Sequence, residues 1–406
     1  MPEKEKVPAI RFKGFPDDWE QRKVGELLAE RNDQAPNSNE YPLMAFIAYE
    51  GVAPKGERYD RSALVNDTVN KLYKKTEYGD FIYSSNNLET GSIGLNKYGK
   101  ATISPVYSIF QPIGLADSDF IGRRLVRKDF INDMVKWRQG VIYGQWRIHE
   151  TDFVKIDILV PSVEEQRKIG ELLDNLDHLI TLHQRKLLKL KNVKKAMLEN
   201  MFPKNGSKVP EIRFAGFTDD WEQRKLTDEV ELYSGLTYSP NDVIKDSGTL
   251  VLRSSNVKNG EVVDADNVYV QPDVVNSANV KVGDIIIVVR NGSRALIGKH
   301  AQIKAKMDNT VIGAFMTGMR SSNSAFTNVL LSTPAFDSEV EKNLGATINQ
   351  ITNGMFQNMQ FMFPSTAEQM KIGHYFTHLD NLITLHQRKF EKLQNLKKAC
   401  LEKMFV

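Results

Sequence analysis

The sequence predicts an α+β protein with two β-rich modules, each followed by a long helix, and the two helices are expected to pair in antiparallel directions. Two internal repeats lead to this prediction. A stretch of 42 residues, 161–202, recurs at 364–405 without a gap and with 27 identical positions. A shorter stretch, 7–24, recurs at 209–226 with 14 of its 18 positions identical. Repeats this long fix the order of the architecture before any motif is considered.

The segments between the repeats are the modules, and they are nearly equal in length but dissimilar in sequence. They share a faint frame. Gly79-Asp80-Phe81-Ile82 precedes Gly94 in the first module, and Gly283-Asp284-Ile285-Ile286 precedes Gly298 in the second. Both frames read as strand, polar loop and strand, which indicates one common fold with two different surfaces. The predicted segments are residues 1–160, 161–203, 204–363 and 364–406.

Each copy of the long repeat is predicted to be one uninterrupted helix. Pro161 and Ser162 supply a stop and an N-cap, and Glu165 follows at the capping-box spacing. Apolar residues then recur at spacings of three and four, as in a heptad seam. About 40 residues make a rod of roughly 60 Å. The apolar seam positions are Ile169, Leu173, Leu176, Ile180, Leu187, Leu190, Met197 and Met201, then Ile372, Phe376, Leu379, Ile383, Phe390, Leu393, Cys400 and Met404.

Two seam positions are polar in both copies, namely His183 with His386 and Lys194 with Lys397. Polar seam residues can fix the register or orientation of a helix pair at some cost in stability. The alternative is that these side chains lie at the edge of the seam and reach water. Because the two copies match, the simplest partner of each helix is the other one.

The shorter repeat is predicted to begin a short helix near Trp19, and again near Trp221, because aspartates precede each tryptophan as N-cap residues. Asp17, Glu20 and Lys23 superficially resemble a nuclease carboxylate cluster. A metal-dependent site needs carboxylates that converge from separate elements, whereas these crowd into one helical turn. We therefore interpret them as capping residues.

Within the modules the predicted strands are many and short, and a few helices interrupt them. The strands are 43–49, 81–83, 102–110, 154–160, 250–253, 285–289, 310–316 and 360–363, and the helices are 129–138 and 333–343.

Composition is ordinary for a water-soluble protein. Of 406 residues, 41% are hydrophobic and 26% charged, with a net charge of +3 and a pI near 8.6. A mildly basic balance does not by itself indicate nucleic-acid binding. The single cysteine, Cys400, excludes a disulfide framework and fits a reducing cytoplasm. The first six residues do not resemble a signal peptide, and no apolar run is long enough for a membrane span.

Recognisable catalytic motifs are absent. The sequence has no phosphate-binding Gly-rich loop ending in Gly-Lys-Ser/Thr, no Gly-x-Gly-x-x-Gly, no Asn-Pro-Pro-aromatic segment and no nucleophile elbow. His374 and His378 have a spacing that could bind a metal, but the first copy has Glu171 and Asn175 there. A solvated helix face is the better interpretation, so we expect neither a catalytic residue nor a metal site.

The polar loops of the modules favour nucleic-acid binding, because Arg, Lys, Asn, Gln, Ser and Tyr side chains reach base edges and phosphates. For any one of them, ordinary solvent exposure is the better interpretation, and it is their clustering beside predicted Gly turns that favours binding for the set. In the first module the candidates are Lys55, Arg58, Arg61, Lys71, Lys74, Lys75, Asn86, Asn87, Lys97, Lys100, Arg138, Gln139, Tyr143, Gln145, Trp146 and Arg147. In the second they are Tyr238, Arg253, Ser254, Ser255, Asn256, Arg290, Asn291, Arg294, Lys299, Arg320, Asn349, Gln350 and Asn353.

The long repeat also resembles a known family. The pattern Pro161-Ser162-x-x-Glu165-Gln166-x-Lys168-Ile169, then Leu176-Asp177-x-Leu179-Ile180 and a basic helix ending Met201-Phe202, is similar to the spacer helices of type I restriction–modification specificity (S) subunits. The Gly-Phe-x-Asp-Asp-Trp openings at 14–19 and 216–221 are also typical of that family. The resemblance covers the whole chain.

The resemblance implies two target recognition domains that each read one half of a bipartite site on double-stranded DNA, with the helices setting the unread gap. Two surfaces about one duplex turn apart need roughly 34 Å, which such a rod can supply. It also implies no active site on this chain, two methyltransferase subunits that carry S-adenosylmethionine, and two motor/nuclease subunits that carry ATP and Mg. Expected partner contacts are Trp19, Trp221, Leu179 and Leu382.

Two other hypotheses stay open from the sequence alone. One is an autonomous nuclease or methyltransferase, which the missing motifs disfavour. The other is a coiled-coil adaptor whose two modules bind proteins, or bind DNA without sequence preference.

Overall fold

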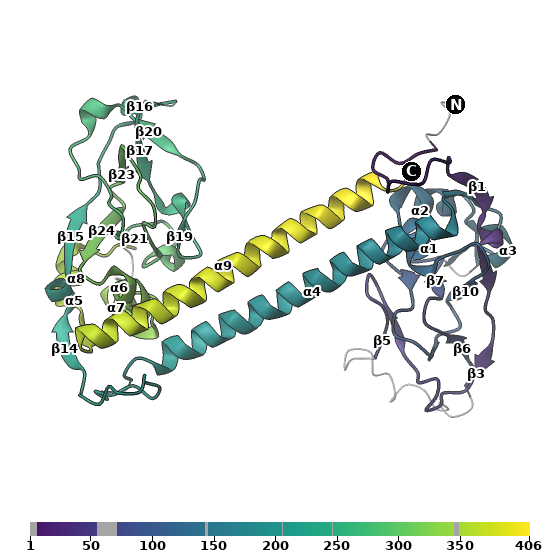
Figure 1. The fold of residues 1–406 in the computed structure, drawn as a ribbon, viewed down its shortest axis with the longest axis horizontal. Helices are drawn as coiled ribbons and strands as arrows, with labels where there is room; N and C mark the ends of the chain where they lie inside the picture. The colour runs from purple at the N-terminus through teal and green to yellow at the C-terminus, as the bar shows by residue number, and fades with distance from the viewer. Residues whose placement is uncertain (1–5, 55–70, 143–144, 205, 246, 345–348) are drawn as a thin grey trace. The chain divides into compact units, whose positions relative to one another are not determined.

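The computed structural model describes residues 6–54, 71–142, 145–204, 206–245, 247–344 and 349–406. The chain forms two compact units. Unit 1 contains Met1–His183 and Lys389–Val406, and unit 2 contains Gln184–Arg388. Each long helix therefore contributes one half to each unit, so that both units combine a module with two helix segments (Figure 1).

The module of unit 1 is built on a four-stranded antiparallel sheet with the order β2-β10-β7-β8. A three-stranded sheet, β3-β6-β9, and three strand pairs, β1-β13, β4-β5 and β11-β12, complete it. The strands are β1 Glu20–Lys23, β2 Leu28–Glu30, β3 Gln34–Ala35, β4 Ala45–Ile47, β5 Gly51–Ala53, β6 Tyr73–Thr76, β7 Phe81–Tyr83, β8 Ile93–Leu95, β9 Ala101–Ile103, β10 Ser108–Pro112, β11 Gln139–Ile142, β12 Gln145–Arg147 and β13 Asp157–Val160. The helices are α1 Ser118–Leu125, α2 Lys128–Val135 and α3 Glu150–Phe153.

The module of unit 2 repeats this plan, since its main sheet has the order β15-β24-β21-β22. Its second sheet, β16-β20-β17-β23, has four strands, and the pairs β14-β25 and β18-β19 complete it. The strands are β14 Glu222–Lys225, β15 Val230–Ser234, β16 Val243–Ile244, β17 Thr249–Leu252, β18 Val257–Lys258, β19 Glu261–Val262, β20 Val268–Val270, β21 Ile285–Val288, β22 His300–Gln302, β23 Thr310–Ile312, β24 Met316–Ser321 and β25 Gln360–Phe363. The helices are α5 Leu226–Glu229, α6 Ser324–Leu330, α7 Pro334–Asn343 and α8 Asn353–Asn358.

The faint frame shared by the modules is a real structural equivalence. Gly79 and Gly283 both have positive φ, +89° and +96°, in the turn before the central strands β7 and β21. Asp80 accepts a hydrogen bond from the amide of Glu77 at 2.7 Å, and Asp284 accepts one from the amide of Lys281 at 3.0 Å. The prediction of one common fold is confirmed.

The two long helices are α4, Val163–Asn200, and α9, Thr366–Lys403, each of 38 residues. The sequence-predicted seam positions are buried or half-buried along both helices. In unit 1, Leu173 and Leu176 of α4 join the same core as Cys400 and Met404 of α9. The start of one helix thus packs beside the end of the other, which is the predicted antiparallel pairing.

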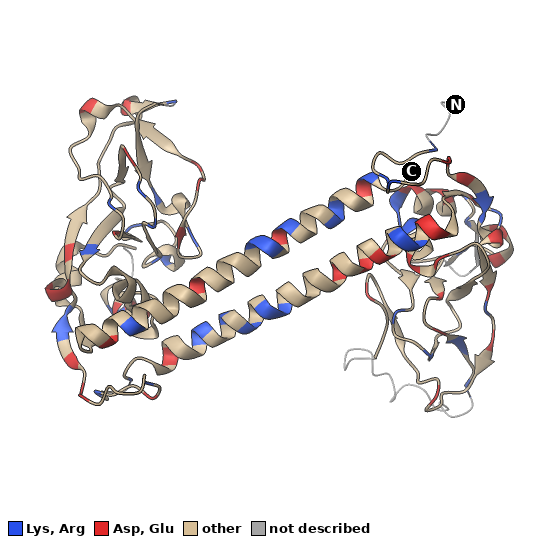
Figure 2. Cartoon of the chain, in the orientation of Figure 1, with Lys and Arg blue, Asp and Glu red and all other residues tan. Residues whose placement is uncertain are grey.

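Charge favours this direction as well as apolar packing does. In both helices the basic residues concentrate in the second half, and in α4 the acidic residues also concentrate in the first half (Figure 2). In unit 1, Lys397 forms an ion pair with Asp177. In unit 2, Lys194 forms the equivalent ion pair with Asp380, at 2.6 Å. The lysines at the polar seam positions therefore bind aspartates of the facing helix and are not simply solvated, while His183 and His386 are half-buried.

The short repeats form strands directly after Trp19 and Trp221, so the predicted short helices near these residues are wrong. β1 pairs with β13 from Glu20↔Val160 to Lys23↔Asp157, and β14 pairs with β25 in the same way. The local capping signal is overridden because the partner strand, more than 130 residues away, offers a full ladder of backbone hydrogen bonds.

The Glu of the capping-box pattern also has a different role from the predicted one. The Glu165 carboxylate is fully buried and accepts two hydrogen bonds from Arg11, at 2.7 and 2.8 Å. Arg213 binds Glu368 in the same manner, at 2.8 and 2.8 Å. These bidentate pairs tie each short repeat to the first turn of the long helix that follows its module.

Most other predicted elements are confirmed with shifted ends. The stretch 102–110 divides into β9 and β10, 310–316 divides into β23 and β24, and 154–160 narrows to β13. In the part of the chain that the structure describes, no helix is both long and apolar enough to cross a membrane.

Candidate nucleic-acid interface

In unit 2, three polar segments that are far apart in the sequence meet beyond the end of β21. Arg290 forms an isolated antiparallel bridge with Gln350. Asn291, the next residue, donates from Nδ2 to the Ser254 hydroxyl at 3.2 Å. The sequence predicted all four residues as candidates, and folding places them in one cluster.

Two further candidates stabilise the same cluster. Asn349 donates from Nδ2 to the carbonyl of Gly292 at 3.1 Å. Lys299 donates from Nζ to the carbonyl of Ser254 at 3.3 Å. These contacts fix the loops with respect to one another, so the cluster is a preorganised surface of unit 2.

Arg290 lies over an aromatic ring that sequence reasoning missed. Its guanidinium carbon is 5.0 Å from the ring centroid of Phe315, which is 56% exposed. The backbone amides of Val289 and Arg290 both donate to the Phe315 carbonyl, at 3.0 and 3.2 Å. No local signal distinguishes Phe315 from the core phenylalanines, because its exposure is decided by long-range packing.

The other candidate arginines of unit 2 are neutralised by carboxylates of their own module. Arg253 binds Asp266 at 2.6 Å, Arg294 binds Glu341 at 2.6 Å and Arg320 binds Asp284 at 3.3 Å. Arg320 also lies over the Tyr233 ring at 4.5 Å, and burial raises the pKa of Tyr233, with its hydrogen bond to Asp284 adding to the effect. These pairs organise the module.

The remaining candidates of unit 2 have structural contacts as well. Asn256 is fully buried and donates to backbone carbonyls of Val263 and Ala265, so it is not available to a ligand. Asn353 donates to the Ser234 hydroxyl at 3.3 Å. Tyr238 packs against a small apolar core, and Ser255 is half-buried.

In unit 1 the corresponding loop follows β7. Asn86 and Asn87 are exposed there, and Arg138 reaches this loop through an ion pair with Glu89 at 3.1 Å. Tyr49 lies beside this loop, and the sequence did not identify it as a candidate. Its side chain is 82% exposed, its φ is +65° and its amide donates to the carbonyl of Gly91 at 3.0 Å.

That backbone conformation is rare for a bulky side chain and is often found at functional positions. Gly91 itself has a φ of +88°, and a Cβ there would lie 2.6 Å from the Tyr49 ring, so a larger residue would strain the backbone and displace the ring. Tyr49 therefore joins the candidate interface of unit 1.

The candidate lysines of unit 1 divide into two groups. Lys71, Lys75 and Lys100 lie over tyrosine rings: Lys71 over Tyr73 at 5.7 Å, and Lys75 and Lys100 over Tyr41 at 4.6 and 5.4 Å. Lys74 is buried in β6, and Lys97 binds Asp119 at 3.1 Å and Asp174 of α4 at 2.7 Å. The second group is structural, so its predicted DNA contact is not supported by these positions.

Among the last candidates of unit 1, Arg147 and Trp146 are exposed and Gln139 donates to Asp152 at 2.8 Å. Gln145 belongs to β12, but its side chain is outside the described part of the chain. Lys55, Arg58, Arg61 and Tyr143 also lie outside the described residues.

Of the predicted partner contacts, the two tryptophans are corrected. Trp19 and Trp221 are each 1% exposed and pack edge-on against Phe405 and Phe202, respectively, which places both indoles in the cores. They cannot reach a partner surface without unfolding. Leu179 is exposed on α4, and Leu382 is half-buried on α9.

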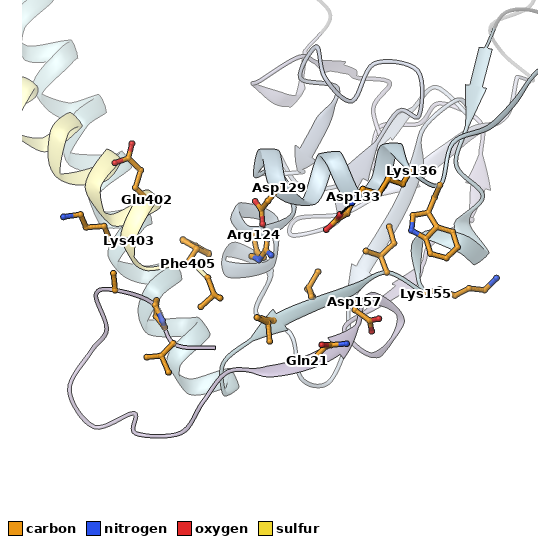
Figure 3. A pocket seen from close by; sticks show the side chains of 18 residues that line it. Gln21, Arg124, Asp129, Asp133, Lys136, Lys155, Asp157, Glu402, Lys403 and Phe405 are labelled. Atoms are coloured by element: carbon orange, nitrogen blue, oxygen red, sulfur yellow. Dashed lines mark hydrogen bonds and ion pairs between the residues drawn. The ribbon is translucent and has the colours of Figure 1, made fainter. Parts of the chain in front are cut away.

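A cavity of about 780 Å³ in unit 1 lies between the N-terminal segment, α2, β13 and the end of α9 (Figure 3). Its lining is mixed in charge and already paired. Arg124 is buried 2.9 Å from Asp129, and burial lowers the pKa of Arg124. Asp133 binds Lys136 at 2.5 Å. Asp129 and Asp133 thus both have a cation beside them.

The described residues contain no group of three or more His, Cys, Asp or Glu side chains that could hold a metal ion. His374 and His378 are both exposed on α9. This fits the predicted solvated helix face.

The chain is thus a duplicated module that keeps its framework and changes its polar loops. The family described as "Type I restriction modification DNA specificity domain" matches residues 16–192 and 218–395. The chain therefore belongs to this family and carries its domain twice.

Similar proteins agree with this assignment. The MjaVIII type I restriction enzyme specificity subunit of Methanocaldococcus jannaschii is 22% identical over 408 residues, covering 95% of this chain and 92% of that protein. The EcoKI specificity subunit of Escherichia coli K12 is 24% identical over 188 residues, 44% of this chain and 40% of its own length. The crystal structure of the S subunit from M. genitalium has the same fold, with a TM-score of 0.57, 13% identity and coverage of 98% and 99%.

Proposed function

We propose that the chain is the non-catalytic DNA specificity subunit of a type I restriction–modification complex, and that each module reads one half of an asymmetric bipartite site. One observation carries this proposal. The two modules share the sheet order around β7 and β21, whereas the loops that follow these strands differ in sequence and contacts. A shared scaffold with different polar loops fits two half-sites of different sequence. The family match does not favour the adaptor hypothesis.

Exchange of one module tests the proposal. Residues 25–160 would be replaced by the equivalent module of another family member, and methylated adenines would be mapped across a genome that expresses the matching methyltransferase subunits. The expected result is one changed half-site, with the other half-site and the gap unchanged. A change in both half-sites, or in neither, contradicts the proposal.

The helices are proposed to set the gap between the half-sites. Each is a single 38-residue helix, so its length is a defined quantity of roughly 57 Å. Removing one heptad within Leu187–Lys194 and its counterpart within Phe390–Lys397 preserves the seam period. It shortens each helix by roughly 10 Å, so the gap should change by at most about three base pairs while both half-sites persist.

Two methyltransferase subunits are proposed to dock on leucines that recur in both helices, of which all but Leu382 are exposed. Leu179 and Leu182 of α4 correspond to Leu382 and Leu385 of α9, and Leu182 and Leu385 are 53% and 46% exposed. Two equivalent apolar sites fit two copies of one partner. S-adenosylmethionine is then expected on the methyltransferase subunits, and ATP and Mg on the motor/nuclease subunits bound through them.

Substitution of both leucines, Leu182→Glu with Leu385→Glu, should weaken co-purification of the methyltransferase subunit while the full chain stays folded. The matched control is Leu188→Glu. Leu188 is also exposed, but its counterpart in the second copy is Glu391, so the control only restores the symmetry of the repeat. Equal loss of binding in both variants would argue against a site at Leu182 and Leu385.

A further inference from the structure

We infer that Arg290, held on the ring of Phe315 beside Gln350, reads a guanine in the half-site recognised by the second module. This inference rests on the proposed function, because it assigns one residue and one base within that recognition. It concerns only contacts inside unit 2.

The guanidinium of Arg290 is available to a ligand in a way that its neighbours are not. Arg253, Arg294 and Arg320 each bind a carboxylate within 3.3 Å. Among the described residues, Arg290 has no such partner, and its side chain is exposed. Arg290 is instead positioned by a cation–π contact with the exposed ring of Phe315.

The ring fixes the guanidinium without consuming its hydrogen-bonding capacity. A cation–π contact uses no N–H hydrogen bond, so the donors of the guanidinium stay available to a ligand. A guanidinium presents these donors as a fork that matches two acceptors at once. Preorganisation of this kind lowers the entropy lost when the base is bound.

The backbone beneath Arg290 is equally well fixed. Its amide and that of Val289 donate to Phe315, and the amide of Ile351 donates to the Val289 carbonyl at 2.8 Å. The bridge with Gln350 then places a second polar side chain next to Arg290. Asn291 and Asn349 are engaged with Ser254 and Gly292, so they support the platform rather than extend from it.

The chemistry of the fork identifies the base. In the major groove, guanine presents O6 and N7 as two adjacent acceptors, and a bidentate arginine is the commonest specific contact to them. A phosphate contact is the alternative use of a free arginine. The two differ in outcome, because a lost phosphate contact weakens binding to all sequences alike, whereas a lost base contact relaxes one position.

The test compares Arg290→Gln with Arg294→Gln in the full chain, expressed with its methyltransferase subunits and assayed by mapping methylated adenines. Arg290→Gln should remove the guanine preference at one position of the second half-site, or convert it to adenine, because a glutamine amide matches adenine N6 and N7. Discrimination at that position should fall by roughly 5- to 150-fold. Arg294→Gln, four residues away and paired with Glu341, should leave the motif unchanged.

The first half-site is an internal control, since its retention shows that the variant folds and assembles. If Arg290→Gln abolishes methylation, selection of duplexes from a randomised pool by the full-length variant and wild-type chains measures base preference directly. Phe315→Leu provides a second variant that keeps apolar volume but removes the ring, and it should weaken the same position to a smaller extent.

An unchanged second half-site in Arg290→Gln overturns the inference, and so does an equal loss of binding to every sequence. A wild-type chain that directs no bipartite motif would instead overturn the proposed function, so the two failures are distinguishable.

Discussion

Unit 1 and unit 2 use matching residues where their modules meet the long helices and unlike residues where their loops extend from the sheets. Arg11–Glu165 in unit 1 corresponds to Arg213–Glu368 in unit 2. Lys168 lies over Phe15 at 4.8 Å, and Lys371 lies over Phe217 at 5.1 Å. The contacts that join each short repeat to its long helix therefore use equivalent residues at similar distances in both units.

The loops show the opposite behaviour. The loop after β21 is fixed to two distant segments through Arg290, Asn291 and Asn349, whereas the loop after β7 lies beside the strained turn at Tyr49. The difference teaches that identity between the repeats concentrates at the attachment sites, where a module must fit a constant helix. The loops after β7 and β21 carry different residues and make different contacts, although the strands before them are equivalent.

The largest loss of stability is expected from Glu165→Gln and Glu368→Gln, which break the equivalent arginine–glutamate pairs of the two units. Each change leaves a largely buried guanidinium without its carboxylate, so each should cost about 3 kcal/mol in the unit concerned. Chemical denaturation followed by hydrogen exchange would assign the loss to unit 1 or unit 2. Glu164→Gln is the control. Glu164 is exposed and its ion pair with Lys168 is long, at 3.7 Å, so the substitution should have almost no effect. Clearly unequal costs would show that the two attachments are not equivalent.

A smaller difference in stability between the units is expected when the equivalent helix glycines, Gly170 and Gly373, are replaced by alanine. A Cβ on Gly373 would lie 2.9 Å from both the Ala325 Cβ and the Phe326 backbone nitrogen. On Gly170 the nearest atom would be the Asp117 side-chain oxygen at 3.0 Å, which caps α1 but belongs to a side chain and not to the backbone. Gly373→Ala should therefore destabilise by about 1–3 kcal/mol through overpacking.

Gly170→Ala should cost less than about 1 kcal/mol, because the gain in helix propensity offsets a milder contact. Thermal melts of both variants at one protein concentration would check the order. A larger loss for Gly170→Ala would contradict the backbone argument.

The sequence could predict the helices, the modules and their antiparallel pairing because these depend on repeats and on apolar periodicity. It could not predict the strand β1, whose partner β13 lies over 130 residues away. The capping pattern at Glu165 was local and visible, but its use in binding Arg11 was not, because that contact forms only once the module has folded. Lys194 and Lys397 were recognised as unusual, yet their aspartate partners needed the register of the helix pair.

The candidate interface was predictable only in composition. Arg290, Asn291, Asn349 and Gln350 were identified as polar loop residues, and folding brings them together. The same reasoning also selected Asn256, which is fully buried, since a polar side chain in a turn looks alike whether it binds a ligand or the backbone. Phe315 and Tyr49 were missed because exposure of an aromatic residue is a property of the whole fold.

Acidification should distinguish the modules further. His300 of unit 2 contacts the Gly298 carbonyl and the Ser332 hydroxyl, each at 3.0 Å, and burial lowers its pKa. The unfolded chain then binds a proton more readily than the folded one, so stability is complete above about pH 6.5 and falls as the pH drops below it. In unit 1, burial raises the pKa of Asp80. The folded state then binds a proton more readily than the unfolded one, so protonation of Asp80 does not destabilise unit 1.

Urea unfolding with hydrogen exchange at pH 7.5 and 5.5 should therefore show unit 2 losing at most about 1.4 kcal/mol more than unit 1. His300→Gln should flatten this dependence. A steeper loss in unit 1 over the same interval would contradict the assignment to His300.

The smallest effect concerns the interhelical ion pairs, which match in residue but differ in surroundings. Asp177 binds Lys397 and also accepts a contact from Arg123 at 2.9 Å, whereas Asp380 is bound by Lys194 at 2.6 Å. Half-exposed pairs contribute little, so Asp380→Asn should cost about 0.5 kcal/mol and Asp177→Asn, which loses two cations, about 1 kcal/mol.

The exchange Lys194→Asp with Asp380→Lys should recover most of the loss seen in either single variant, measured by thermal melting at low and high salt. Such recovery would show that the charge pair, and not the identity of either residue, favours the antiparallel direction. Failure of the exchange to recover stability would mean that the aspartates act through contacts within their own helix. The apolar seam alone would then account for the pairing.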